Sequence, residues 1–249
     1  MWDNSIPMPG ATALTRLKVY DTMGPDGQLS GTPHFHLVCS EMYFVLSGSG
    51  AVELIDARGF SRVELMPNAT LVFTPGTLHR LVNPNGDLHL LIVMQNSGLP
   101  ERGDTIATFK PAVLSDDLAF FKAMRAGTLD EAYIRRDAAV TGFLEVKDEF
   151  TRSHAEGRAM LETIYKLALA RTSSKYKEWY ECVVNGAFTD AQSSLTQILE
   201  LGGKKLGHLF ESQHRLIQGA ETSTVGFCGN LNRYFDPGSL WPEGVRDSN

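Results

Sequence analysis

Apolar and polar residues alternate along most of residues 11–96, in short runs that turns separate. Leu17 and Val19, for example, alternate with basic residues, as in a strand with one buried face. Turn sequences rich in proline and glycine, such as Met23–Gln28, recur between these runs, and no helical period intervenes. Many short strands at close spacing predict an antiparallel β-barrel or a two-sheet jelly roll.

The stretch Gly31–Gly50 carries two histidines on one strand, His34 and His36. Glu41 lies five residues beyond His36, so it could not share that face on one straight strand. We therefore expect the chain to break near Cys39–Ser40 and a second strand to begin there. Further strands are expected at residues 11–20, 51–55, 62–65, 69–73 and 87–95.

From about residue 99 the apolar residues recur at helical spacing instead. Asp116 and Asp117 can cap a first helix that ends near Gly127. Later helices are expected at residues 129–140, 155–171, 176–183, 187–201 and 205–218. We therefore divide the chain into a β-barrel (1–110) and a helical C-terminal region (111–249), which has too few strand signals to extend the first sheet. The aromatic stretch 225–244 is expected to be a loop that packs onto something.

Composition excludes several classes of function. The formal net charge is −6 without a Lys/Arg cluster, so nucleic acid is not an expected partner. The longest apolar run, Leu88–Met94, is too short to span a bilayer. The first ten residues show no basic and apolar leader, and three scattered cysteines indicate free thiols. We expect a cytoplasmic protein that binds no membrane.

Candidate chemistry is concentrated in two stretches. His34 and His36 point to one face of their strand, and Glu41 can approach the same place from the next strand. His79 lies in a second compact stretch, Phe73–Asn83, after a tight loop. Three imidazoles and one carboxylate suit zinc, iron, nickel, copper or manganese, and contain too much nitrogen for calcium or magnesium. Four protein ligands would leave two positions open on a six-coordinate ion.

These two stretches resemble the two sequence motifs of the cupin superfamily. The first motif matches at Gly31, His34, His36, Glu41 and Gly48, and the second at Gly76, His79 and Asn83. Thr74 stands where the second motif usually has proline, which affects the turn and not a ligand. The resemblance covers roughly residues 15–96. It implies a cupin β-barrel with a divalent metal ion held by His34, His36, Glu41 and His79, and it implies that the protein could form a homodimer.

Other residues near the motifs have simpler interpretations. Arg80 follows His79 and points the other way, so a surface or salt-bridge role is favoured over substrate binding. Cys39 is expected to be a small buried residue. The histidines His154, His208 and His214 are expected in solvent. Residues proposed to line the pocket are Tyr43, Val45, Phe73, Leu81, His89 and Gln95.

Three functions remain open at this point. The first is a metal-dependent enzyme acting on a small molecule, and a slight preference for a sugar isomerase or lyase comes from the run HRLVNPNG, which resembles a run in type II mannose-6-phosphate isomerases. The second is an iron-dependent dioxygenase. The third is a non-catalytic sensor that binds a small ligand. No catalytic residue is assigned. For a dimer, the candidate surfaces are the aromatic tail and the face Tyr176–Val184.

Overall fold

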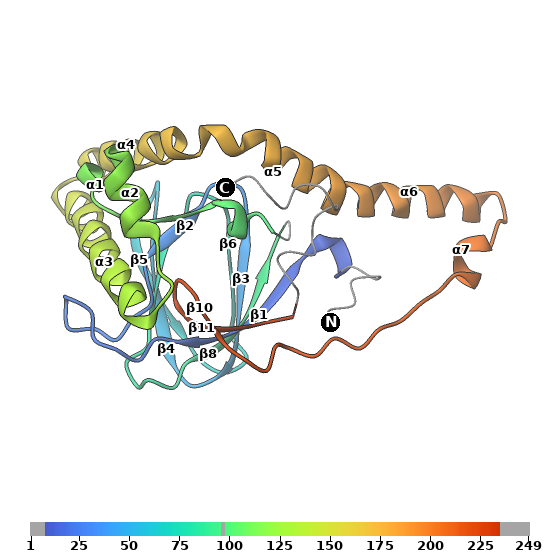
Figure 1. Ribbon diagram of the computed structural model, residues 1–249, viewed down its shortest axis with the longest axis horizontal. Coiled ribbons are helices and arrows are strands. Elements are labelled where there is room, and N and C mark those ends of the chain that lie inside the picture. Colours follow the sequence, from blue (N-terminus) through green and yellow to red (C-terminus); the bar gives the residue numbers. More distant parts are fainter. Residues whose placement is uncertain (1–7, 96–97, 235–249) are drawn as a thin grey trace.

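The computed structural model of the protein describes residues 8–95 and 98–234 (Figure 1). The N-terminal segment 1–7, residues 96–97 and the end of the aromatic tail, 235–249, lie outside the described residues. The β half begins with the short helix η1 (Pro9–Ala11), and a second one, η2 (Pro100–Arg102), precedes its last strand. Its strands are β1 (Ala13–Val19), β2 (His34–His36), β3 (Glu41–Ser47), β4 (Gly50–Asp56), β5 (Gly59–Leu65), β6 (Thr70–Phe73), β7 (Leu78–Val82), β8 (His89–Met94) and β9 (Thr105–Ala107).

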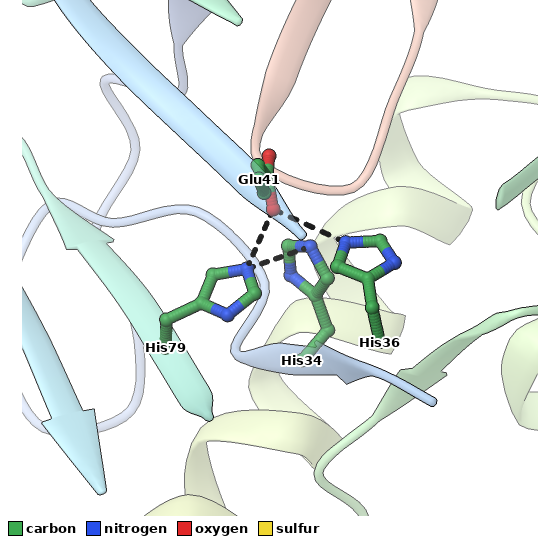
Figure 2. Close-up of side chains that lie close together, drawn as sticks. All are labelled: His34, His36, Glu41 and His79. Carbon is green, nitrogen blue, oxygen red and sulfur yellow. Dashed lines mark hydrogen bonds and ion pairs between the residues drawn. The ribbon is translucent and has the colours of Figure 1, made fainter. Parts of the chain in front are cut away.

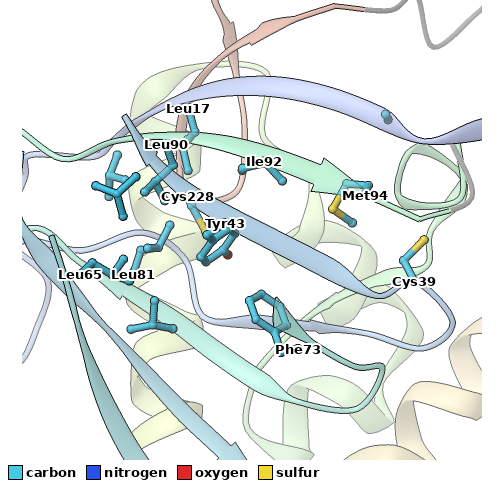
Figure 3. Close-up of a cluster of buried hydrophobic side chains, with 14 of the residues drawn as sticks. Leu17, Cys39, Tyr43, Leu65, Phe73, Leu81, Leu90, Ile92, Met94 and Cys228 are labelled. Atoms are coloured by element: carbon cyan, nitrogen blue, oxygen red, sulfur yellow. The ribbon is translucent and has the colours of Figure 1, made fainter. Parts of the chain in front are cut away.

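The strands form two antiparallel sheets, as the alternating pattern predicted. One sheet has the order β10-β11-β1-β8-β3-β6 and the other the order β5-β4-β7-β2-β9. A core of apolar side chains from both sheets fills the space between them (Figure 3). The expected jelly roll is confirmed in this two-sheet form, in which the sheets are not closed into a barrel.

The helical region follows the β half. Its elements are α1 (Pro111–Ser115), α2 (Asp117–Met124), α3 (Leu129–Arg152), α4 (His154–Thr172), η3 (Ser173–Lys175), α5 (Tyr176–Val183), the π-type turn η4 (Val184–Phe188), α6 (Thr189–Gly202) and α7 (Gly207–Phe210). Asp116 caps α2, because its carboxylate accepts a hydrogen bond from Ala119 N at 2.7 Å. A capping box at Thr128 and Glu131 starts α3. Two expectations here were wrong in length: α3 extends to Arg152 and not to residue 140, which is more than three turns longer, and the last helix, α7, is much shorter than the expected 205–218.

The first four helices cover the outer face of the five-stranded sheet. A second apolar core joins Phe35, Ile55 and Leu78 of that sheet to side chains of α1 to α4. Gly142 allows α3 to approach the end of β9, because a Cβ atom there would lie 2.0 Å from Thr108 O. This layer buries β2 and β7 on both faces, and these are the strands that carry the three histidines.

The end of the C-terminal region differs from the sequence prediction. The chain returns to the first sheet as β10 (Thr224–Val225) and β11 (Gly229–Arg233), and β11 pairs with β1 so that Leu231 lies opposite Leu17. The expectation that this region adds no strand was therefore wrong, because β11 holds one apolar residue and gives no alternating signal. In Figure 1, α6 projects from the body of the molecule, and the chain runs back below it to β10.

Candidate metal centre

The four predicted ligand residues come together between the two sheets (Figure 2). His34 on β2 lies directly opposite His79 on β7, and Glu41 is the first residue of β3. One ligand atom from each of these residues and from His36 lies within 4.8 Å of all the others, and all four residues are buried. These side chains could hold a metal ion.

Backbone carbonyls fix the rings of two of the histidines. His34 Nδ1 lies 2.9 Å from Thr32 O, and His79 Nδ1 lies 2.9 Å from Thr77 O. A carbonyl oxygen only accepts, so each Nδ1 carries the proton and each Nε2 keeps its lone pair. The two Nε2 atoms are 3.0 Å apart. Two lone pairs face each other at this distance, and a bound cation would satisfy both.

His36 is oriented by a residue that the sequence did not reveal, Asp104. His36 Nδ1 lies 3.1 Å from Asp104 Oδ2, which leaves Nε2 to face Glu41. A carboxylate behind a histidine in this way is the usual support of a metal-binding imidazole. Asp104 also accepts hydrogen bonds from the backbone N–H groups of Leu37, Val38 and Cys39.

Asp104 therefore performs two tasks. It holds the turn at residues 37–39, where the sequence predicted the chain to break, and it orients His36. It is fully buried, just before β9, in a segment interpreted from the sequence only as the boundary of the β half. Its partners lie more than sixty residues earlier, so no local pattern could identify it.

Burial and nearby charges affect the three groups differently. Burial, together with the neighbouring imidazoles, holds the pKa of His34 well below its ordinary value. Burial also opposes protonation of His36, but the carboxylates of Asp104 and Glu41 outweigh it and raise its pKa to about 9. For Glu41, burial is outweighed by His36 and His79, which lower the pKa of the carboxyl group. Glu41 is therefore an anion at neutral pH.

Two buried atoms of the cluster, His36 Nε2 and Glu41 Oε2, form an ion pair at 3.1 Å without a well-aligned hydrogen bond. Glu41 Oε2 also lies 3.4 Å from His79 Nε2. A divalent ion would replace the proton on His36 and bind three neutral nitrogens and one carboxylate oxygen, so the donor set fits a transition metal.

The loop that carries His79 is tied to both halves of the molecule. Gly76 has a φ of 84° and donates its N–H to His36 O at 2.8 Å. Its carbonyl accepts a hydrogen bond of 2.5 Å from the hydroxyl group of Tyr165 on α4. The helical region therefore helps to set the position of His79.

A cavity of about 270 Å³ adjoins the donor cluster. His34, His36, Glu41 and Tyr43 form one wall, and apolar residues such as Ile92 and Met94 form another. The hydroxyl group of Tyr43 is buried without a hydrogen-bond partner in the described part of the chain. Burial raises the pKa of Tyr43 well above its ordinary value, so this hydroxyl stays protonated.

Of the six residues proposed to line the pocket, Tyr43 borders this cavity and the other five do not. Val45, Phe73 and Leu81 belong to the apolar core between the sheets, and Figure 3 shows Phe73 beside Tyr43 there. His89 and Gln95 have the wrong parity, because the alternate residues Leu90, Ile92 and Met94 of β8 point inward. Strand β8 is so apolar that its sequence does not show which of its faces points inward.

The remaining wall comes from the C-terminal region. The segment Val225–Cys228, here called the strap, crosses the cavity between β10 and β11. The ring of Phe227 lies 5.1 Å from that of His34, centroid to centroid. The strap is held by Tyr20, whose hydroxyl donates to Gly226 O at 2.9 Å. The aromatic stretch was expected to pack onto something, but not onto the metal centre.

Several secondary expectations can also be assessed. Arg80 forms salt bridges as expected but is completely buried, with Asp26 oxygens at 2.7 and 2.8 Å. Cys39 is buried, and its thiol group donates to Gln95 O. The three remaining histidines lie far from the site: His154 and His214 are exposed, and His208 is half-buried beside Glu200. No described helix is long and apolar enough to cross a membrane.

Comparison with known proteins agrees with the motifs. Residues 22–94 match the family described as a cupin domain. No curated protein matches the chain.

Similar solved structures include the following three. WlaRA, a TDP-fucose-3,4-ketoisomerase from Campylobacter jejuni, is 17% identical over 33% of this chain and 58% of its own, with a TM-score of 0.28. KdgF from Halomonas sp. is 21% identical over 36% of this chain and 71% of its own, with a TM-score of 0.27. Oxalate decarboxylase from Bacillus subtilis is 18% identical over 26% of this chain and 18% of its own, with a TM-score of 0.25. This chain thus spans less than two thirds of the first and third of these proteins.

The family match covers both stretches that contain the donor residues, from before His34 to beyond His79. The strand order, with the donors between two antiparallel sheets, agrees with it. Residues 22–94 therefore match a cupin domain, and the resemblance seen in the two sequence motifs is confirmed for this part of the chain.

Proposed function

We propose that the protein is a metal-dependent enzyme that acts on a small molecule. His34, His36, Glu41 and His79 would hold a divalent transition metal such as zinc, iron, manganese or nickel. The observation that carries the proposal is the facing pair of Nε2 atoms of His34 and His79, 3.0 Å apart with both protons committed to carbonyls. An ion bound there would act as a Lewis acid that polarises a ligand oxygen.

The cavity supplies the other elements that such an enzyme needs. Tyr43 keeps its proton, and its buried hydroxyl lacks a well-formed hydrogen bond among the described residues, so it can donate a hydrogen bond to an oxygen of the ligand. Apolar side chains such as Ile92 and Met94 line the same cavity. A polarised oxygen beside a hydrogen-bond donor suits isomerase or lyase chemistry, and we favour this class over an iron-dependent dioxygenase or a non-catalytic sensor.

Metal content of the purified protein tests this proposal. We expect about one transition-metal ion per chain, measured by elemental analysis, and its loss in His34→Ala and His79→Ala. His89→Ala is the matched control, because His89 lies on β8 outside the cluster. Equal metal content in all four proteins would contradict the proposal, and so would a metal-free wild type that cannot be loaded.

The reaction class needs a separate measurement. We expect proton exchange or isomerisation of a small carbonyl compound with zinc or manganese bound and no oxygen uptake. Oxygen consumption by the iron-loaded protein would instead identify a dioxygenase. Stabilisation by ligands without turnover would identify a sensor.

We also propose that the protein forms a homodimer through the projecting arm, residues 189–210, which comprises α6 and α7. The arm has no buried residue in α6, and Leu199 and Phe210 are 77% and 86% exposed. Further exposed apolar residues on the arm are Leu195, Ile198, Leu201, Leu206 and Leu209. A stripe of this kind on a soluble surface marks an interaction site, and a second copy of the same chain is its commonest partner.

Sedimentation tests the dimer. Leu195→Glu combined with Leu199→Glu should convert a dimer to a monomer, whereas Leu118→Glu on the exposed face of α2 should not. A wild type that sediments as a monomer would contradict the proposal. A cytoplasmic location also remains a proposal, which the three free cysteines support.

A further inference from the structure

Three arginine side chains are almost completely buried in the described part of the chain, and they differ in their partners. Arg80, which is 0% exposed, pairs with Asp26, and Arg136, which is 2% exposed, pairs with Asp137 at 2.6 Å. Arg135, which is 6% exposed, has no carboxylate within ion-pair distance among residues 8–95 and 98–234. Its charge therefore lacks the counterion that the other two possess.

The contacts of Arg135 are all with neutral groups. Nη1 donates to Met124 O at 3.2 Å, and Nη2 donates to Gly226 O at 2.6 Å. The guanidinium group lies 4.1 Å from the centre of the Phe227 ring. Its Nε has no hydrogen-bond partner among the described residues. Burial of a charge without an opposite charge is costly, so a bound anion would stabilise this arrangement.

Arg135 is also part of the cavity wall. The formally charged residues of that wall are Glu41, Glu101, Arg135 and Arg233. Arg233 is paired with Glu101, with Nε and Oε1 3.8 Å apart, and Glu41 faces the histidines. Among the arginine and glutamate side chains of the described cavity wall, Arg135 is the one without a partner of opposite charge.

We propose that this cavity binds a small organic acid whose carboxylate pairs with Arg135, which would make Arg135 a specificity-determining residue. This inference deepens the proposed function and rests on it, because the other end of the acid would face the donor cluster. Arginine and carboxylate form strong charge-assisted hydrogen bonds. The apolar side chains of Leu17, Ile92 and Met94 fit a short hydrocarbon body between the two ends.

Matched probes can test the proposal without knowledge of the natural substrate. Hydroxamates with a tail of one to three methylene groups, ending in either a carboxylate or the isosteric carboxamide, would be titrated into the zinc-loaded protein. At the best tail length, the wild type should bind the carboxylate about ten- to a hundredfold more tightly, as expected of a hydrogen bond to a charged group. Arg135→Gln should reduce this preference to nearly one, and Arg135→Lys should keep part of it.

A control separates recognition of the acid from support of the fold. Arg136→Gln removes the neighbouring buried arginine, which does not border the cavity, and should keep the carboxylate preference. Equal loss of the preference in Arg136→Gln would overturn the inference, because the effect would then be structural.

The zinc content of each protein distinguishes this inference from the proposed function. A fully loaded wild type that shows no carboxylate preference, or that prefers a phosphonate tail, overturns the inference and leaves the metal proposal intact. If the wild type cannot be loaded, the metal proposal fails. The unfolding temperature of the metal-free protein is then measured by thermal shift with succinate and with succinamide. If succinate raises this temperature in the wild type and not in Arg135→Gln, the result would still support the acid site. No difference between the two compounds would overturn it.

Discussion

Two neighbouring residues of β7, His79 and Arg80, belong to two buried polar clusters that differ in one respect. Arg80 faces away from the space between the sheets and is matched by Asp26, with Glu53 at 3.4 Å on β4. His79 faces the opposite way, and the lone pair on its Nε2 points at the lone pair on His34 Nε2. The cluster around Arg80 contains its own counterions. The histidine cluster has ligand atoms that could hold a cation, so burial alone does not distinguish a structural ion pair from a candidate ligand site.

Removal of Arg80 should have the largest effect on stability. Arg80→Ala would leave Asp26 and Glu53 beside an empty buried space, and loss of one partner of a buried ion pair costs about 3–5 kcal/mol. Urea denaturation measures the change. Arg58→Ala, at an exposed ion pair, should leave the free energy of unfolding almost unchanged. A small effect at Arg80 would mean that its cluster does not stabilise the fold.

Removal of the metal should have the next largest effect. A ligand at a hundredfold excess over its Kd stabilises a protein by about 2.7 kcal/mol, so chelation should lower the free energy of unfolding by roughly this amount. Thermal denaturation before and after dialysis against a chelator measures it. An unchanged unfolding temperature in protein shown to contain metal would contradict the view that the histidine cluster requires a cation.

The support of His36 should have a smaller effect. Asp104→Asn keeps the shape but removes the charge behind the imidazole, and such changes typically weaken metal affinity by about 10- to 100-fold. Competition with a fluorescent chelator measures the affinity. Asp148→Asn on the exposed side of α3 is the control and should leave the affinity unchanged. If both variants bind metal as the wild type does, Asp104 only holds the turn.

The contribution of the Arg80 cluster to stability should be lost at low pH. Burial raises the pKa of Asp26, but the hydrogen bonds with Arg80 and Gln28 outweigh this effect and lower the pKa from 3.8 to about 2. A lowered pKa adds stability that is complete above the unfolded value and is lost as the pH falls through the folded value. Metal-free wild type should thus lose stability between pH 3.8 and about 2, and Asp26→Asn should lose less. Parallel curves for the two proteins would contradict this assignment.

The sequence predicted those parts of the site that depend on local spacing. The two-residue spacing of His34 and His36 placed both rings on one face, and the parity of Glu41 required the break that separates β2 from β3. The strand pattern likewise predicted two antiparallel sheets. These features follow from the period of a strand, which a few adjacent residues are enough to define.

The remaining features depend on contacts between distant segments. Asp104, Arg135 and the strap reach the site from positions far along the chain, and none of them stands out from its neighbours in sequence. Residues 184–186 were expected to separate two helices, but the chain continues through them as the π-type turn η4. Tertiary packing determines the conformation at these positions, and the local propensity of the sequence does not predict it.

The pairing of β11 with β1 has a consequence for the order of events during synthesis. Leu231 meets Leu17 after all seven α-helices of the described chain have been made, and the strap next to it forms one wall of the cavity. Contacts at such sequence separation form late and slowly. On the ribosome, the two sheets can therefore bring the histidines together while the cavity is still open on the strap side. We expect an ion to enter in this interval, before the last strand closes the wall.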